Sequence, residues 1–286
     1  MGENPERDLF FPILSSDALM GPFLLIGRLF TTGIFVFYTF NLVTKIHSPG
    51  ALLYLAIAAQ LAGIVLIVLG YKTRFAALLL AVCIVASLLF RGGFGLHNFL
   101  STIAEKDIAI AGGFLFLFAY GPGGLSLDRL QGGAQPGGIP DNGAAIGPLL
   151  LLGRVLSVFV FFFFGISKIL HTPEIKAYMV RHNPHVPTDL VYLAILTQIV
   201  PPLLVLLGYK TRYGALALAG FCLIATTLFH AEFGNPSEVE HFLLDFAIAG
   251  VFLFMFAEGP GPLSLDAWLG RAKRTGMTKE ALSVGA

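Results

Sequence analysis

Apolar residues fall into eight long runs along the chain, separated by shorter polar connections. The runs cover residues 22–43, 51–70, 75–91, 99–120, 148–170, 188–208, 213–230 and 242–257. A helix needs about 20 predominantly apolar residues to cross a bilayer, and tilt or local thinning accommodates a shorter run. The pattern predicts an all-α, polytopic membrane protein with eight transmembrane helices.

Several sequence strings occur twice, in the same order. The matching strings are Gly27-Arg28 with Gly153-Arg154, residues 69–74 with 207–212, residues 107–112 with 245–250, and residues 121–128 with 259–266. Four helices per copy is an even number, so both copies enter the membrane from the same side. The chain is therefore predicted to be a parallel repeat of two four-helix bundles.

The two copies are separated by residues 121–147, which hold nine Gly and three Pro. This composition is typical of a flexible linker that forms no packed element. The predicted organisation is an N-terminal cytoplasmic segment (1–21), a first repeat (22–120), a cytoplasmic linker (121–147), a second repeat (148–270) and a basic cytoplasmic tail (271–286).

Composition and charge narrow the class of protein. Hydrophobic residues make up 56% of the chain and charged residues 12%, whereas soluble proteins carry about 25% charged residues. A soluble enzyme is excluded, and the lipid bilayer is the expected surrounding. Since the formal net charge is only +1, no basic surface argues for nucleic-acid binding.

The Lys and Arg residues indicate an orientation. More of them lie on the side that carries both termini, the linker and the two Tyr-Lys-Thr-Arg loops than on the other side. By the positive-inside rule, both termini are expected in the cytoplasm of a multi-pass plasma-membrane protein.

All seven histidines fall on the predicted outer side, together with several carboxylates. Imidazole titrates near neutral pH, so such a group could relay protons or ligate a metal. The strongest candidates are His230, Glu232, Glu240, His241 and Asp245. The alternative is a polar loop that contacts water and headgroups, and no His-Glu-x-x-His spacing predicts a metal site.

Asp245 is predicted to be a buried group, because an apolar stretch follows it directly. A carboxylate inside a membrane needs a partner, and Lys168 or His230 is the expected one. A carboxylate that only stabilises the first turn of its helix is an equal alternative.

Two further sets of residues have simple structural interpretations. Arg28 and Arg154 are expected to bond Gln60 and Gln198 of a neighbouring helix, which would hold the bundle together. Phe163 and Phe164 belong to an aromatic run that would face lipid or pack in the core, although a quinone ring could also bind there.

These motifs resemble the DoxX family of four-helix membrane proteins. The resemblance rests on Gly153-Arg154, Gly165 to Lys168, the Leu207-Gly208 helix end with Thr211-Arg212, and residues 259–266, with a weaker copy over about 22–130. The first copy has Thr39 to Leu42 where the second has Gly165 to Lys168. The resemblance implies a bacterial inner membrane protein related to the DoxD subunit of thiosulfate:quinone oxidoreductase.

Three functions are compatible with the sequence. The first is a membrane subunit of, or accessory to, a quinone-linked oxidoreductase that oxidises a small sulfur compound at the outer side with a soluble or membrane redox partner. In it, Lys168 would steady an anionic substrate, while His230, His241 and Asp245 would manage protons. The second is a non-catalytic scaffold, docked through residues 168–187. The third is a small-solute transporter, for which Pro201-Pro202 would kink or unwind the sixth helix.

Overall fold

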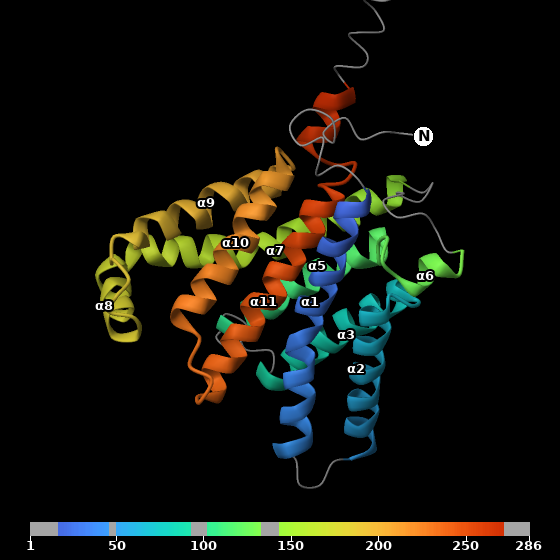
Figure 1. Ribbon diagram of the computed structural model, residues 1–286, viewed down its shortest axis with the longest axis horizontal. Helices are drawn as coiled ribbons and strands as arrows, with labels where there is room; N and C mark the ends of the chain where they lie inside the picture. The colour runs from blue at the N-terminus through green and yellow to red at the C-terminus, as the bar shows by residue number, and fades with distance from the viewer. Residues whose placement is uncertain (1–16, 46–49, 93–101, 133–142, 272–286) are drawn as a thin grey trace, which may run out of the picture.

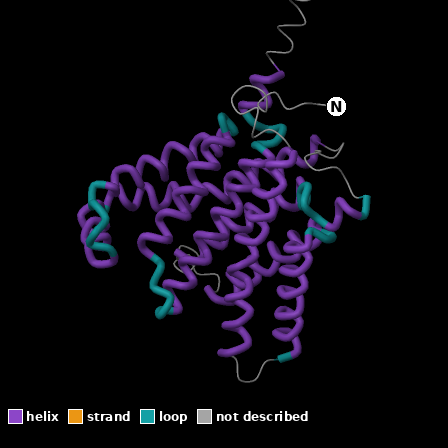
Figure 2. Tube along the Cα trace, in the orientation of Figure 1, coloured by secondary structure: helices purple, strands orange, loops and turns teal. Residues whose placement is uncertain are grey.

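The computed structural model describes residues 17–45, 50–92, 102–132 and 143–271. The regular structure within these ranges is helical and contains no strand (Figure 2). The helices are α1 (Asp17–Lys45), α2 (Ala51–Leu69), α3 (Thr73–Gly92), α5 (Thr102–Tyr120), α6 (Leu127–Leu130), α7 (Gly143–Leu170), α8 (Thr172–His182), α9 (Leu190–Leu207), α10 (Thr211–Phe229) and α11 (Pro236–Glu258). The all-α prediction is confirmed, and the long helices coincide with the predicted apolar runs.

Five helices of the described chain are long and apolar enough to cross a membrane: α1, α7, α9, α10 and α11. The apolar parts of α2 and α3 are shorter. The fourth predicted run, 99–120, contains the charged residues Glu105, Lys106 and Asp107 near its start. The chain is therefore a multi-pass membrane protein, and the number of eight crossings stays a prediction.

The two halves of the chain contact each other through pairs of glycines. α1 packs along α11, and α5 packs along α7 (Figure 1). A Cβ atom at Gly250 of α11 would lie 2.6 Å from the carbonyl oxygen of Gly27 in α1. A Cβ atom at Gly112 of α5 would likewise lie 2.7 Å from the carbonyl oxygen of Gly153 in α7. Glycine at these positions lets the backbones touch, as is common between membrane helices.

Aromatic contacts close each half internally. Phe35 of α1 meets Phe114 of α5 with ring centroids 5.6 Å apart, and Phe161 of α7 meets Phe252 of α11 at 5.3 Å. The buried residues of both halves belong to one continuous hydrophobic core. The two predicted four-helix sets thus share one hydrophobic core, and their arrangement as a parallel repeat stays a prediction.

Arg28 caps a helix end. Its guanidinium donates to the carbonyl oxygens of Ile67, at the end of α2, and of Leu125. Gly70 has a φ of +66°, and a Cβ atom there would clash with this guanidinium. Arg154 makes the corresponding contacts with the carbonyl oxygens of Leu206 and Leu263.

The predicted hydrogen bonds from arginine to glutamine are therefore wrong. Gln60 instead accepts a hydrogen bond from Thr39 Oγ1 at 3.1 Å, and the Oε1 atom of Gln198 accepts none from the described residues. The reason is depth: Gln60 lies seven residues, about 10 Å, before the Ile67 carbonyl that Arg28 binds. The two side chains are at different levels of the same helix pair.

The first part of the predicted linker is packed, contrary to expectation. Asp128 of α6 accepts hydrogen bonds from the backbone N–H groups of Lys72 and Thr73, at 2.7 and 3.2 Å, and so caps the start of α3. Asp266 makes the same contacts with Lys210 and Thr211. The glycine- and proline-containing turn at residues 121–128 includes the Leu125 carbonyl that Arg28 binds. Residues 133–142 of the predicted linker lie outside the described ranges.

The sixth long helix, α9, is helical through Pro201 and Pro202. The expected unwinding at these residues is therefore not found. The two prolines still remove two backbone donors from the helix, because proline has no N–H group.

Candidate functional site

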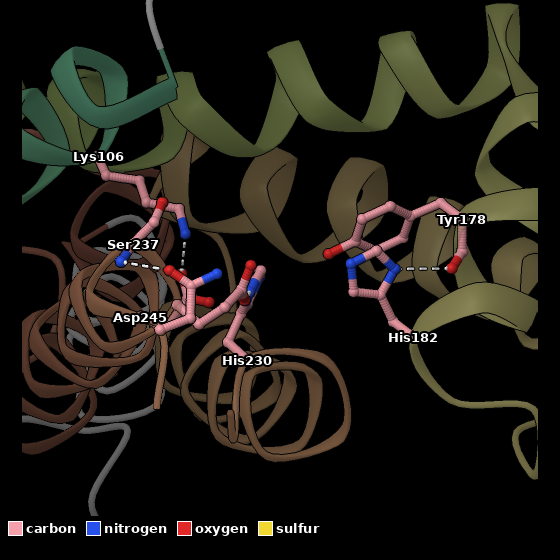
Figure 3. A network of polar contacts seen from close by, with 8 residues as sticks. Lys106, Tyr178, His182, His230, Ser237 and Asp245 are labelled. Atoms are coloured by element: carbon pink, nitrogen blue, oxygen red, sulfur yellow. Dashed lines mark hydrogen bonds and ion pairs between the residues drawn. The ribbon is translucent and has the colours of Figure 1, made fainter. Parts of the chain in front are cut away.

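Polar side chains from several helices meet at the predicted outer end of the second half (Figure 3). We call this set the outer-end network. Its members are Lys106 of α5, Lys168 of α7, His230 at the end of α10, and Glu238, His241 and Asp245 of α11. Tyr178 and His182 of α8 lie beside it (Figure 3).

The centre of the network is an ion pair between the two halves of the chain. Lys106 Nζ lies 2.6 Å from Asp245 Oδ1, and the two side chains are only 8% and 13% exposed. The partner of Asp245 is therefore Lys106, and not the Lys168 or His230 expected from the sequence. Since α5 contacts α11, the first turn of α5 brings Lys106 to Asp245. An ion pair this buried needs both members, because removing one leaves an uncompensated charge.

His230 and His241 lie next to each other above this ion pair. His230 Nδ1 is 2.7 Å from Glu238 Oε2, and the two imidazole centroids are 5.2 Å apart. His241 Nδ1 is buried and has no hydrogen-bond partner among the described residues. Neutral imidazole carries one donor and one acceptor nitrogen, so each of the two rings can both accept and donate a proton.

The N-terminus of α11 places these residues. Asn235 is the N-cap and accepts a hydrogen bond from the Ser237 N–H group at 3.0 Å, with Pro236 at the first helical position. Both features are typical of helix starts. Glu238 follows in the first turn, where the helix dipole favours a carboxylate. The turn back from α10 brings His230 within reach of it.

Lys168 lies at the end of α7 on the inner side of the network. Its Nζ atom is 5.5 Å from the centroid of the Phe164 ring, and its charge interacts with those of Asp245 and Lys106. Phe163 packs edge-on against Phe164 at 5.7 Å and is 39% exposed. The Lys168 ammonium therefore lies over the Phe164 ring, and the adjacent Phe163 ring is exposed at the surface.

α8 covers the side of the network. The Tyr178 ring stacks on the His182 ring at 3.9 Å, and Asn183 donates to the carbonyl oxygen of Leu228 in α10. Burial raises the pKa of the Tyr178 phenol above its ordinary value, and the Glu238 and Asp245 carboxylates act in the same direction.

The comparisons with known proteins place this architecture. The DoxX family model matches residues 149–231. Inner membrane protein YqjF of Escherichia coli is 33% identical over 122 residues, which are 43% of this chain and 92% of that protein. The chain belongs to the DoxX family. Inner membrane protein YphA of the same organism is 29% identical over 131 residues, 44% of this chain and 94% of that protein. No solved structure matches the chain.

Several predicted site residues of this DoxX protein do come together. His230, His241, Asp245 and Lys168 share the network, and Phe164 adjoins it. Glu232 is exposed and has no hydrogen bond or ion pair to the network within the described ranges, and Glu238 occupies the position beside His230. His47 and His97 lie outside the described residues. No group of three His, Cys, Asp or Glu side chains suited to a metal occurs in the described ranges.

Lys106 and Glu238 are two members of the network that the sequence pattern did not single out. The signal for Glu238 was present, because Asn-Pro-Ser-Glu reads as an N-cap followed three residues later by Glu. Lys106 carried no comparable signal, since its partner belongs to the other half of the chain.

The corresponding place in the first half of this DoxX chain is built differently. Asp107, the counterpart of Asp245 in the repeated strings, is buried and accepts a hydrogen bond from Tyr38 Oη at 3.0 Å. Phe164 stands where the first half has Tyr38, so the second half lacks that hydroxyl. Asp245 is thereby free to pair with Lys106.

Proposed function

We propose that this DoxX protein is the membrane component of a quinone-linked oxidoreductase of the bacterial inner membrane, and that the outer-end network handles its protons. The observation that carries the proposal is the Lys106–Asp245 ion pair, buried beside the two histidines. Buried ionisable groups in membrane proteins are energetically unfavourable and mark proton or substrate pathways by default.

The aromatic residues at the end of α7 fit a quinone. Phe163 is open to the lipid, from which a hydrophobic ring would arrive, and Phe164 lies under the Lys168 ammonium. A bound quinone would supply the two-electron acceptor. Phe163 and Phe164 would hold its ring, Lys168 would donate a hydrogen bond to a carbonyl oxygen, and His241 and His230 would move protons between the ring and the Glu238 edge.

The electron donor in this proposal is a small sulfur compound at the outer side. Its electrons arrive through a redox partner subunit, because the chain offers residues for binding and proton transfer and no motif for a redox cofactor. α8 is the expected docking element, since it extends to one side of the long helices and only Met179 of its residues is buried (Figure 1).

The lengths of the relatives support a tandem arrangement. This chain covers 92% and 94% of the two Escherichia coli proteins, while they cover 43% and 44% of it. Each relative thus has about the length of one half. We infer that the chain holds two DoxX units, in which identical caps stabilise both and the outer-end network belongs to the second.

A scaffold role is the second candidate, favoured by the exposed surface of α8. In that case α8 would still recruit the partner, while the network would serve only stability. The two functions differ in what happens when the network is altered and the fold is kept.

The test is quinone reduction by thiosulfate in membrane vesicles that contain the protein and its co-purified partners. Asp245→Asn and His241→Ala are expected to abolish donor-dependent reduction. Glu232→Gln is the matched control and is expected to retain the wild-type rate, because Glu232 is exposed. The double variant Lys106→Met with Asp245→Leu separates loss of function from unfolding. It removes both charges, and an apolar pair can replace a buried ion pair without loss of stability. Full activity in this folded double variant would refute the proton-handling proposal and leave the scaffold.

A further inference from the structure

Gln198 of α9 presents two hydrogen-bond acceptors that lack their usual donors in the described part of the chain. The side chain is buried, with 4% exposure, and its Oε1 atom has no hydrogen-bond partner among the described residues. Its backbone carbonyl would normally accept from the N–H group of residue 202, or of residue 201 in a tighter turn. Both are proline, so neither donor exists.

The neighbouring helix does not supply the missing donors. Gln198 O faces Gly165 of α7, where a Cβ atom would lie 3.3 Å from this oxygen. Glycine carries no side-chain donor. In the first half, Thr39 stands at the position of Gly165, and its hydroxyl bonds Gln60 at 3.1 Å. The residues after Gln60 include no proline, so the backbone there keeps its normal donors.

Two more unsatisfied polar atoms lie toward the outer-end network. Thr226 of α10 is fully buried, and neither its Oγ1 atom nor His241 Nδ1 has a partner among the described residues. Cys222, which is buried, lies one helical turn inward from Thr226 on α10. Lys168 lies three residues, about 4.5 Å, outward from Gly165. Gln198, which packs against Gly165, is therefore about one helical turn from the backbone of Lys168.

We propose that buried water molecules bind along this path, between α7, α9, α10 and α11, from His241 inward to Gln198. Water has two O–H donors and two acceptor sites, and a buried water needs two to four polar partners. Gln198 offers two acceptors, and Thr226 and His241 offer further partners. Burying these groups unsatisfied in a membrane protein would be strongly unfavourable.

The proposed water sites follow from the buried polar atoms of Gln198, Thr226 and His241 and do not depend on the proposed function. Their use rests on the proposed function: a hydrated path would extend proton transfer from His241 to the middle of the second half. The first half, in which Thr39 satisfies Gln60, has no such path at that position.

The test is hydroxyl-radical labelling in water enriched in heavy oxygen, on the full-length protein in lipid nanodiscs. Radicals formed at bound water oxidise sulfur atoms beside it, so Cys222 is the reporter. Met255 of α11 is the matched control, because it is also fully buried but lies ten residues beyond Asp245, toward the opposite end of the helix. Cys222 is expected to take up label well ahead of Met255, although both are buried. Equal, slow labelling of both sulfurs would overturn the proposal.

A variant gives a second readout. Gln198→Leu is expected to reduce labelling of Cys222 toward the level of Met255, whereas Gln60→Leu is expected to leave it unchanged. Gln198→Leu is also expected to lower the Tm by about 2–4 °C if it loses a water-mediated hydrogen bond. A higher Tm would show that Gln198 has no partner of any kind. These readouts do not involve quinone reduction, so they can succeed or fail independently of the proposed function.

Discussion

The Lys106–Asp245 ion pair gives the sharpest prediction on stability. In Asp245→Asn the Lys106 ammonium stays 8% exposed and loses its carboxylate. It also remains near Lys168, whose positive charge then acts without compensation. Removing one member of a buried ion pair destabilises a protein by about 3–5 kcal/mol. At roughly 2 °C per kcal/mol for a chain of this size, the Tm falls by about 6–10 °C.

The double variant separates charge from packing. Lys106→Met with Asp245→Leu removes both charges and keeps the volume apolar, and such replacements are neutral or stabilising by up to about 4 kcal/mol. We therefore expect a Tm at or above that of the wild type. A double-mutant cycle compares the wild type, Lys106→Met, Asp245→Leu and the double variant. We expect the destabilisation by the two single changes to be strongly non-additive, because each alone leaves an unpaired buried charge.

The assay is loss of monodisperse protein on heating in a mild detergent, followed by size-exclusion chromatography. Lys176 and Asp189 supply the matched control, because their ion pair is equally short, 2.7 Å, but its side chains are 30% and 81% exposed. Neutralising either of these residues is expected to change the Tm little. If Asp245→Asn and the double variant melt at the same temperature, the reasoning about an uncompensated buried charge is refuted.

Three further predictions concern other parts of the fold. Gly250→Ala is expected to lower the Tm by several degrees, because the added methyl group would lie 2.6 Å from a backbone carbonyl oxygen of α1. Gly220→Ala is the control in the same melting assay, because a Cβ atom there has open space around it. Asp266→Ala is expected to lower the stability by about 1 kcal/mol through loss of the α10 cap, measured by the same method. Asp189→Asn is expected to lower the raised pKa of Lys176 toward its ordinary value, because the hydrogen bond that the Lys176 ammonium donates to the Asp189 carboxylate favours the charged form. NMR titration of isotope-labelled methyl-lysine measures this pKa, and an unchanged value contradicts the prediction.

The helices were predictable because each apolar run is long and its ends carry clear signals. Gly70 and Gly208 end α2 and α9 with φ near +66° and +68°, as C-terminal glycines commonly do. The contacts between halves were not predictable in the same way. Gly27 and Gly250 are ordinary small residues in the sequence, and only the packing of α1 on α11 makes them a crossing point.

The candidate site was partly predictable for a related reason. His230, His241 and Asp245 are close in sequence, so a turn between two helices is enough to bring them together. Lys106 is remote in sequence and could be placed only by the three-dimensional contact of α5 with α11. The predicted hydrogen bond between Arg28 and Gln60 could have been rejected from the sequence. Gln60 lies near the centre of α2, and the helix rise places it about 10 Å from the level of the Ile67 carbonyl that the guanidinium binds.

The two halves of the chain share their caps and differ where the network lies. In the first half, Tyr38 donates a hydrogen bond to Asp107 Oδ1, and Thr39 donates one to Gln60 Oε1. In the second half Phe164 and Gly165 take these two adjacent positions, and both hydroxyls are lost. This pair of differences leaves Asp245 to pair with Lys106 of the other half, and it leaves Gln198 Oε1 without a donor among the described residues. Restoring the hydroxyl by Phe164→Tyr should therefore draw Asp245 away from Lys106, so the same two positions control both the site and the contact between halves.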